Sequence, residues 1–363
     1  MPVANRGSGV TRYILENWRF LADEFVFDFA TRSPALDFAE EALAKGGRLH
    51  RLSGTSGENE ERFIWEMEAI LDSGYAAVHL HTSFWSGFLA ERLARERGTP
   101  VIAVHAHSTM ADLEDPGERE AAVRLHERLK REFTPELATH FCACSAAAAA
   151  WLFGPQIDRG RIRILKNAVD LDKFAFNPGV RERVRKELGL GDSPVLGYAG
   201  RFSYQKNPEM LLEIFRLVQI RNPRARLLLA GDGPRLEPVR RLAGELSLTG
   251  KALFLGRRGD VAELLQAMDV FLLPSRFEGL GLALVEAQAA GLRCLASERV
   301  PVEAKLTPLL TFLPLDPGVW AEAALEPDSG RDRREGAALV AEAGYSLQEA
   351  AKILARLYRG ELS

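Results

Sequence analysis

The sequence has no long apolar run, no large excess of charge of either sign, and few cysteines. None of its apolar runs approaches the about 20 residues that span a bilayer, and the opening MPVANRGSGV lacks the apolar core of a secretory signal. A net charge of -3 over 363 residues excludes a global field that would attract nucleic acid. The three cysteines, Cys142, Cys144 and Cys294, match no zinc or redox spacing. We therefore expect a cytoplasmic protein with buried, reduced thiols.

What the sequence does contain is a regular alternation of short apolar runs with longer amphipathic stretches. The candidate strands span 24–30, 48–52, 76–82, 100–107, 139–145, 161–167, 194–200, 224–232, 252–256, 270–275 and 293–298. Amphipathic segments such as 58–74 and 207–222 lie between them and predict helices. Continuous apolar strands joined by helices are typical of parallel sheets that are covered on both faces. The predicted fold class is therefore α/β, with doubly wound parallel sheets.

Two series of such units follow one another along the chain. A fresh strand opens at 194–200, after the segment 165–179 and a charged helix. We predict one Rossmann-like domain over 1–168, a second over 169–345, and a terminal amphipathic helix over 346–363 that packs back toward the first domain. Ligands of open α/β sheets bind at the loops that follow the carboxyl ends of the strands. We expect these loops of the two domains to face each other across a cleft.

The segment SRFEGLGLALVEAQAAG, 275–291, places glycines between a strand end and a helix that begins near Gly281. Glycine lets the backbone approach a ligand closely, and a helix start offers unpaired N–H groups and the positive end of a dipole. These features suit a diphosphate. The carboxylates of Glu278 and Glu286 are strong acceptors that suit sugar and ribose hydroxyls. The alternative is an ordinary helix start with two solvated glutamates.

A second segment, GYAGRFSYQKNP, 197–208, carries two cations where a strand gives way to a helix. Arg201 follows the strand, and Lys206 precedes the helix that begins near Pro208. Two such cations predict an anion pocket, although two surface cations in a loop would give the same pattern. The N-terminal NRGSGV places Gly7 and Gly9 before a helix, which is a weaker signal for a phosphate loop.

These segments resemble elements of the retaining family 4 glycosyltransferases, which have the GT-B fold of two Rossmann-like domains. Glu278-x7-Glu286 in FEGLGLALVEAQAAG looks like the family's E-x7-E element, and GRFSYQKNP looks like its GR-x4-K-N phosphate element. AGDGP, 230–234, and FLGRRGDV, 254–261, fall in the family's order. RGSGVTRYI, VHAHST and the ending AGYSLQEAAKILARLY look closest to capsule and exopolysaccharide enzymes.

The resemblance implies that the C-terminal domain binds a nucleotide-sugar donor and that the N-terminal domain takes the acceptor. Residues at the positions of Arg201 and Lys206 would neutralise the donor diphosphate as the glycosidic bond breaks. Glu278 would hold the donor sugar and Glu286 the ribose. The remaining implied donor contacts are Arg258 near the base, Gly7 and Gly9, and the backbone of Gly279, Leu280, Gly281 and Leu282.

The resemblance also implies a histidine near the reacting sugar, at the end of the candidate strand 100–107. His105 and His107 lie two apart and share a face of that strand, so both fit. We favour His107, which lies nearer the loop. A hydrogen-bonded core imidazole is the alternative for either residue. We assign His79 and His81, on the preceding candidate strand, to packing or to the acceptor side.

No Asp-x-Asp stands at a strand end, where it would hold a metal on the diphosphate. With Arg201 and Lys206 supplying positive charge, we predict that transfer needs no metal and no cofactor. The resemblance implies retention of configuration, a nucleotide-sugar donor, with UDP favoured, and a glycan or lipid-linked saccharide acceptor. The alternatives are a nucleotide-sugar epimerase of the same fold and a non-catalytic partner subunit that only binds the nucleotide sugar.

Two further segments concern where the protein acts in the cell and whether the first domain begins with a full strand. The stretch 121–133 predicts a basic amphipathic helix that suits the anionic inner face of a membrane or a lipid diphosphate, although a solvated helix face would look the same. Its cations are Arg124, Arg128, Lys130 and Arg131. Family members usually begin with a full strand, whereas only MPVAN precedes Arg6 here. We therefore expect the first strand to be short or missing, which would weaken the loop of Gly7 and Gly9.

Overall fold

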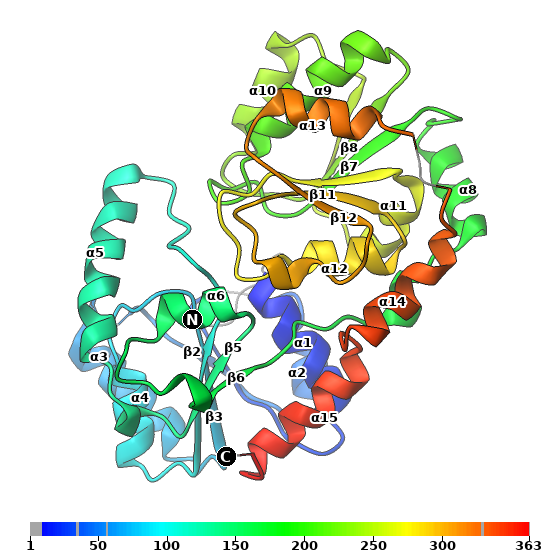
Figure 1. Cartoon of the computed structure of the whole chain (residues 1–363). Helices are drawn as coiled ribbons and strands as arrows, with labels where there is room; N and C mark the ends of the chain where they lie inside the picture. Colours follow the sequence, from blue (N-terminus) through cyan, green and yellow to red (C-terminus); the bar gives the residue numbers. More distant parts are fainter. Residues whose placement is uncertain (1–8, 34–35, 56, 328–329, 363) are drawn as a thin grey trace. The chain divides into compact units, whose positions relative to one another are not determined.

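The computed structural model describes residues 9–33, 36–55, 57–327 and 330–362 of the chain (Figure 1). The chain folds into two compact units. Unit 1 comprises residues 1–167 and 347–363, and unit 2 comprises residues 168–346. These bounds differ by one residue from the limits expected from the sequence.

Unit 2 is built on a six-stranded parallel sheet. Its strands are β7 (Val195–Ala199), β8 (Arg226–Ala230), β9 (Ala252–Gly256), β10 (Val270–Leu273), β11 (Arg293–Ser297) and β12 (Leu310–Leu313). The spatial order is β12-β11-β10-β7-β8-β9, so the chain runs outward from β7 to β9 and then returns to β10 on the other side of β7. Open α/β sheets bind ligands where the strand order reverses in this way. The gap between the ends of β7 and β10 is therefore the expected site in this unit.

Helices connect the strands of unit 2 and precede or follow them at its ends. They are α7 (Leu171–Phe174), α8 (Pro178–Glu187), α9 (Pro208–Arg221), α10 (Leu236–Glu245), α11 (Val261–Ala267), α12 (Leu282–Ala289), α13 (Pro317–Leu325) and α14 (Gly336–Glu342). α9 begins at Pro208, whose fixed φ suits a first helical turn. Apolar side chains such as Leu228 and Phe271 are fully buried in the sheet. The helix starts predicted near Pro208 and Gly281 are both present.

The edge strand β12 was not predicted from the sequence. It is four residues long and has no alternating burial: Leu310 is buried, Thr311 is exposed, and Phe312 and Leu313 are both partly buried. Pro308 and Pro314 flank it, and proline within or beside an apolar run argues against a strand. The strand forms because it pairs with β11, a contact that the local sequence does not reveal.

Unit 1 contains a four-stranded parallel sheet and a separate two-stranded parallel one. The larger sheet has the order β3 (Ala77–Thr82), β4 (Val101–Ala106), β5 (His140–Ala143) and β6 (Ile162–Ile164), and the smaller pairs β1 (Phe29–Thr31) with β2 (Leu49–Arg51). The helices are α1 (Gly9–Leu21), α2 (Ala39–Ala44), α3 (Glu60–Leu71), α4 (Leu89–Glu96), α5 (Pro116–Glu132), α6 (Ala146–Leu152) and α15 (Leu347–Tyr358). The expectation of a short or missing first strand concerns residues 1–8, which lie outside the described residues.

The last helix, α15, completes the core of unit 1. Its buried Leu354 and Leu357 belong to one apolar cluster with Val101, Ala103 and Cys142 of the larger sheet. Tyr358, at the end of α15, reaches the same sheet and contacts His79 with its hydroxyl oxygen 2.8 Å from Nδ1. The chain therefore returns to unit 1 after completing unit 2.

All three cysteines are free thiols, and all three are buried. Burial raises the pKa of Cys142 to about 12 and also raises that of Cys294. A thiol with such a pKa stays protonated at neutral pH and is a poor nucleophile and metal ligand. The cysteines therefore serve packing, as their spacing indicated.

Candidate donor-binding site

The loops that follow β7 and β10 contact each other directly. The backbone N–H of Arg276 donates to the carbonyl of Gln205 over 2.7 Å, and the side-chain amide of Gln205 donates to the carbonyl of Phe277 over 3.0 Å. The guanidinium of Arg276 donates to the carbonyl of Tyr204 over 2.7 Å and lies over its ring, 4.6 Å from the centroid. Two loops 70 residues apart in sequence thus form one structure at the point where the strand order reverses.

Glu278 and Lys206 form an ion pair at the centre of these loops. Lys206 Nζ lies 2.6 Å from Glu278 Oε1, which also accepts a hydrogen bond from the hydroxyl of Ser275 over 2.7 Å. The amide of Gln205 donates to the other oxygen, Oε2, over 3.1 Å. Glu278 is 3% exposed, and a buried carboxylate needs hydrogen-bonding partners such as these three. The contacts fix the carboxylate in place and hold the ammonium group beside it.

Arg201, the other predicted cation, lies in the same loop but points its side chain to solvent. Its carbonyl accepts a hydrogen bond from the hydroxyl of the buried Tyr198 over 2.7 Å, which fixes the backbone, while the residue itself is exposed. The two cations therefore differ in their partners and in their exposure to solvent. Lys206 is held by Glu278, and the guanidinium of Arg201 is accessible to an anion from solvent.

The AGDGP segment, 230–234, packs against the backbone of the loop that carries Arg201. Gly231 and Gly233 both have φ of +144°, and a Cβ atom on Gly231 would lie 1.8 Å from the carbonyl oxygen of Gly200. The N–H of Phe202 donates to the carbonyl of Asp232 over 2.7 Å. Only glycine combines this backbone conformation with so close an approach. The two glycines thus set the position of the loop that carries Arg201.

The start of α12 faces the same loops. Gly281 precedes the helix with φ of +91°, and no side chain caps the first turn. The first N–H groups of a helix have no partner within it and carry its positive dipole end. The buried Leu280 and Gly279 lead into this turn, and Leu282 opens the helix. Glu286 lies in the second turn of α12 and is 1% exposed.

Arg258 lies farther along unit 2, after β9. Both ends of its guanidinium donate to Asp260, over 2.8 Å from Nε and 2.5 Å from Nη2. The pairing raises the pKa of Arg258 and lowers that of Asp260. Gly256, at the end of β9, has φ of +66° and accepts a hydrogen bond from the N–H of Gly231. The segment 256–258 is therefore tied to the AGDGP loop through its backbone.

The two candidate histidines lie in unit 1 and differ in burial. His105 is fully buried within β4, whereas His107 follows the strand and is partly exposed. The imidazole Nε2 of His107 lies 2.8 Å from Nδ1 of His81. Burial lowers the pKa of both candidates well below the ordinary value, so both rings are neutral at pH 7. Gly9 begins α1 in the same unit, and Gly7 lies outside the described residues.

Comparison with known proteins decides the family. A model described as "Glycosyl transferase 4-like domain" matches residues 8–168, and one described as "Glycosyl transferases group 1" matches residues 180–306. Over 98% of its length the chain is 34% identical to the putative glycosyltransferase EpsF of Bacillus subtilis (strain 168), 94% of which is covered. The chain belongs to the family 4 glycosyltransferases.

This glycosyltransferase has further relatives in sequence and in structure. It is 30% identical, over 61% of its own chain and 58% of the other, to the UDP-Gal:alpha-D-GlcNAc-diphosphoundecaprenol alpha-1,3-galactosyltransferase of Escherichia coli. The crystal structure of Anabaena Alr3699/HepE in complex with UDP-glucose has a TM-score of 0.75 at 17% identity, with 99% of this chain and 98% of that chain covered. The fold prediction is thereby confirmed: the enzyme has the GT-B fold with two Rossmann-like domains.

Two donor-loop residues of the glycosyltransferase were not singled out from the sequence. Ser275 and Gln205 both hold Glu278, and neither carries a charge that marks it as a ligand. Their positions offered a signal, because Ser275 ends a predicted strand and Gln205 immediately precedes Lys206. Buried hydroxyl and amide groups beside a buried carboxylate are expected to hydrogen-bond to it.

The basic helix of the glycosyltransferase, α5, is less cationic than the stretch 121–133 indicated. Arg124 pairs with Glu120 at 2.6 Å, and Lys130 donates to the carbonyl of Ala150 over 2.8 Å. The whole helix carries five basic and four acidic residues. Among the residues that the structure describes, no helix has the length and apolar character to cross a membrane.

Proposed function

We propose that this glycosyltransferase transfers a sugar from a UDP-sugar to a lipid-linked saccharide, with retention of configuration, during synthesis of a cell-surface polysaccharide. The observation that carries the proposal is the pairing of Lys206 with Glu278 where the strand order of unit 2 reverses. The name of the E. coli relative, with its UDP-galactose donor and diphosphoundecaprenol-linked acceptor, supports these substrate classes. A cytoplasmic site of action, with α5 resting on the membrane surface, is part of the proposal.

In the proposed reaction, cleavage of the sugar–phosphate bond leaves negative charge on the departing diphosphate. Lys206, Arg201 and the first N–H groups of α12 stabilise that charge more in the transition state than in the donor. The diphosphate competes with Glu278 for Lys206, because both are anions within reach of one ammonium group. Ser275 and Gln205 keep the carboxylate in place, so that it accepts from a hydroxyl of the donor sugar.

The other predicted residues take supporting roles in this proposal. Glu286 accepts from the ribose hydroxyls, and the backbone at 256–258, next to Arg258, contacts the uracil. As the family resemblance implies, we also assign His107 to a contact with the reacting sugar and Gly7 and Gly9 to contacts with the diphosphate. A neutral imidazole acts there as a hydrogen-bond partner and not as a cation.

The mechanism that we propose has no covalent intermediate. Glu278 is the carboxylate nearest the expected diphosphate, and it is engaged by Lys206, Ser275 and Gln205, which suits binding better than nucleophilic attack. The acceptor then attacks from the face that the diphosphate leaves. We expect the product to keep the anomeric configuration of the donor.

The test of the proposed function is a transfer assay with the full chain, UDP-hexoses and a polyprenyl diphosphate-linked saccharide. The expected result is a product one sugar longer, with the donor's anomeric configuration in its NMR spectrum. An inverted product would contradict retention. Isomerised nucleotide sugar without acceptor would identify an epimerase, and UDP binding without turnover by any acceptor would identify a non-catalytic subunit.

We expect transfer to proceed at an unchanged rate when Mg²⁺ and Mn²⁺ are omitted. Lys206 and Arg201 provide the positive charge that a divalent ion supplies in metal-dependent transferases. Initial rates with EDTA should therefore match those with added Mg²⁺ or Mn²⁺. An activity that is lost in EDTA and restored by Mg²⁺ or Mn²⁺ would show that an ion bridges the phosphates, and the assignment of Lys206 and Arg201 would then be wrong.

A further inference from the structure

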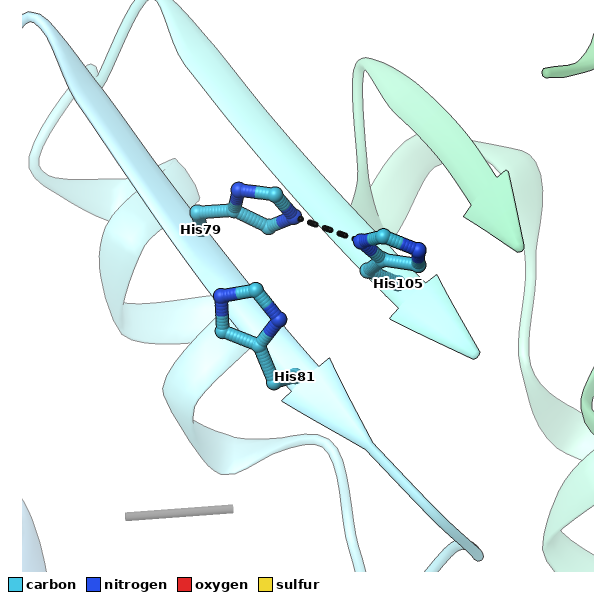
Figure 2. A group of neighbouring side chains, drawn as sticks. All are labelled: His79, His81 and His105. Carbon is cyan, nitrogen blue, oxygen red and sulfur yellow. Dashed lines mark hydrogen bonds between the residues drawn. The ribbon is translucent and has the colours of Figure 1, made fainter. Parts of the chain in front are cut away.

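A cluster of histidines lies on one face of the larger sheet of unit 1. His79 and His81 come from β3 and His105 from the neighbouring β4, and Figure 2 shows the three rings turned toward one another. His81 and His105 are register partners across the two strands, which places their side chains side by side. One ring nitrogen of each histidine lies within 4.8 Å of the corresponding atom of the other two.

The spacing and orientation of these rings suit a metal ion. Nε2 of His79 lies 3.2 Å from Nδ1 of His105. Two nitrogens bound to one tetrahedral Zn²⁺ at about 2.0–2.1 Å lie roughly 3.3 Å apart, so this pair already has the separation of two ligands. The ligand nitrogen of the third ring, His81, lies within 4.8 Å of those of the other two, so this ring has to move closer to complete the set.

In two of the rings, one nitrogen is held by a hydrogen bond, as is usual for histidines that bind a metal. Nδ1 of His79 hydrogen-bonds to the hydroxyl of Tyr358 over 2.8 Å, and Nδ1 of His81 hydrogen-bonds to Nε2 of His107 over 2.8 Å. A ligating imidazole typically uses one nitrogen for the metal and is oriented through the other. Nε2 is thus the nitrogen through which a metal would bind each of these rings.

The cluster also contains an unsatisfied polar atom. His105 is fully buried, and its Nε2 has no hydrogen-bond partner among the described residues. An unpaired buried nitrogen is costly, and native structures keep few of them. A cavity of about 360 Å³ is lined by His79, His81 and Tyr358, so a solvent-derived ligand has room beside the rings. The metal would bind the opposite nitrogen of this ring, Nδ1, which faces His79, and its solvent ligand would occupy the cavity.

We propose that His79, His81 and His105 bind a divalent transition metal of the zinc, cobalt or copper class, with a fourth position open to the cavity. Three imidazoles and no carboxylate select these ions over Mg²⁺ or Ca²⁺, which take oxygen ligands. Three neutral ligands leave the ion's charge at +2, so the fourth ligand is an anion such as hydroxide. All three ligands come from unit 1 and none comes from the donor loops of unit 2, so the proposal does not rest on the proposed function.

The test is a Co²⁺ titration of the tag-free full chain after removal of bound metals by chelation. The expected result is one equivalent bound per chain, with the visible absorption band of tetrahedral Co²⁺. His79→Gln and His105→Gln should each weaken binding by more than about 100-fold. The matched control is His50→Gln, because His50 lines the same cavity but pairs with Asp28 and Tyr75. It should bind Co²⁺ like the parent chain.

A further variant decides the matter if the histidine substitutions unfold the chain. Tyr358→Phe keeps the ring and removes only the hydroxyl that orients His79. Loss of a group that orients a metal-binding ring should weaken Co²⁺ binding by about 10-fold or more. No binding by the parent chain at micromolar Co²⁺, or equal binding by the parent chain and Tyr358→Phe, would overturn the proposal.

Discussion

Replacing Lys206 with alanine is expected to lower kcat by about 10²–10³-fold, which corresponds to about 3–4 kcal/mol of lost transition-state stabilisation. Lys206 is half of the ion pair at the junction of the two donor loops, and its ammonium group is the fixed cation nearest the expected diphosphate. The measurement is the initial rate of sugar transfer at saturating donor. Lys186→Ala is the matched control, because Lys186 is an exposed lysine in α8 of the same unit.

Lys206→Ala also removes the cation that pairs with a buried carboxylate. Its effect on folding stability therefore has to be measured separately from its effect on the catalytic rate. Glu278 is 3% exposed, and without Lys206 its carboxylate would keep the neutral donors Ser275 and Gln205 but lose this ammonium group. Breaking a buried pair in this way destabilises a protein, and neutralising the remaining partner relieves the cost. The double variant Lys206→Ala, Glu278→Gln should therefore recover stability but not activity. A Lys206→Ala enzyme that keeps its kcat within twofold would remove Lys206 from the mechanism.

Replacing Gly231 with alanine is expected to destabilise unit 2 by about 3 kcal/mol or more. The new Cβ would lie 1.8 Å from the carbonyl oxygen of Gly200, and the backbone at φ of +144° is strained for any residue with a side chain. Because the clash is with backbone, no flexible side chain can move away to relieve it. Hydrogen exchange in urea, followed by mass spectrometry of peptides from β7 and β8, reports the stability of this unit.

Gly244→Ala provides the matched control for this prediction. Gly244 lies inside α10, and a Cβ there would meet nothing within 4 Å. Alanine at such a helical position should leave unit 2 unchanged or stabilise it by about 0.5–1 kcal/mol. If Gly231→Ala is as stable as Gly244→Ala, the AGDGP segment does not brace the loop of Arg201 in the way that we describe.

The donor loops were accessible to sequence reasoning because each is a local feature. A buried strand, a glycine and a helix start are adjacent in the chain at 197–208 and again at 275–291, so both loops could be placed at strand ends. The helix start expected near Gly281 is present, and Gly281 itself has a positive φ, which glycine adopts readily. What could not be read locally is that β7 and β10 are neighbours, which brings Lys206 within 2.6 Å of Glu278.

Unit 1 contains more contacts between distant segments of the chain, and the sequence alone does not predict them. Two histidine pairs stand on the candidate strands 76–82 and 100–107, and nothing in the sequence indicates that the two pairs meet. Their mutual contact depends on the parallel register that sets His81 opposite His105. The contact of His79 with Tyr358 joins residues 279 positions apart. No local pattern reports pairings of this kind, because tertiary packing decides them.

The most direct test of the donor-site account is a crystal structure of the full chain with UDP bound. We expect a diphosphate at the ends of β7 and β10, with Lys206 Nζ hydrogen-bonded to a phosphate oxygen and the first N–H groups of α12 turned toward it. We also expect the carboxylate of Glu286 to accept hydrogen bonds from the ribose hydroxyls. UDP bound away from these loops, or a diphosphate held through a divalent ion while Lys206 stays paired with Glu278, would contradict this assignment of the site.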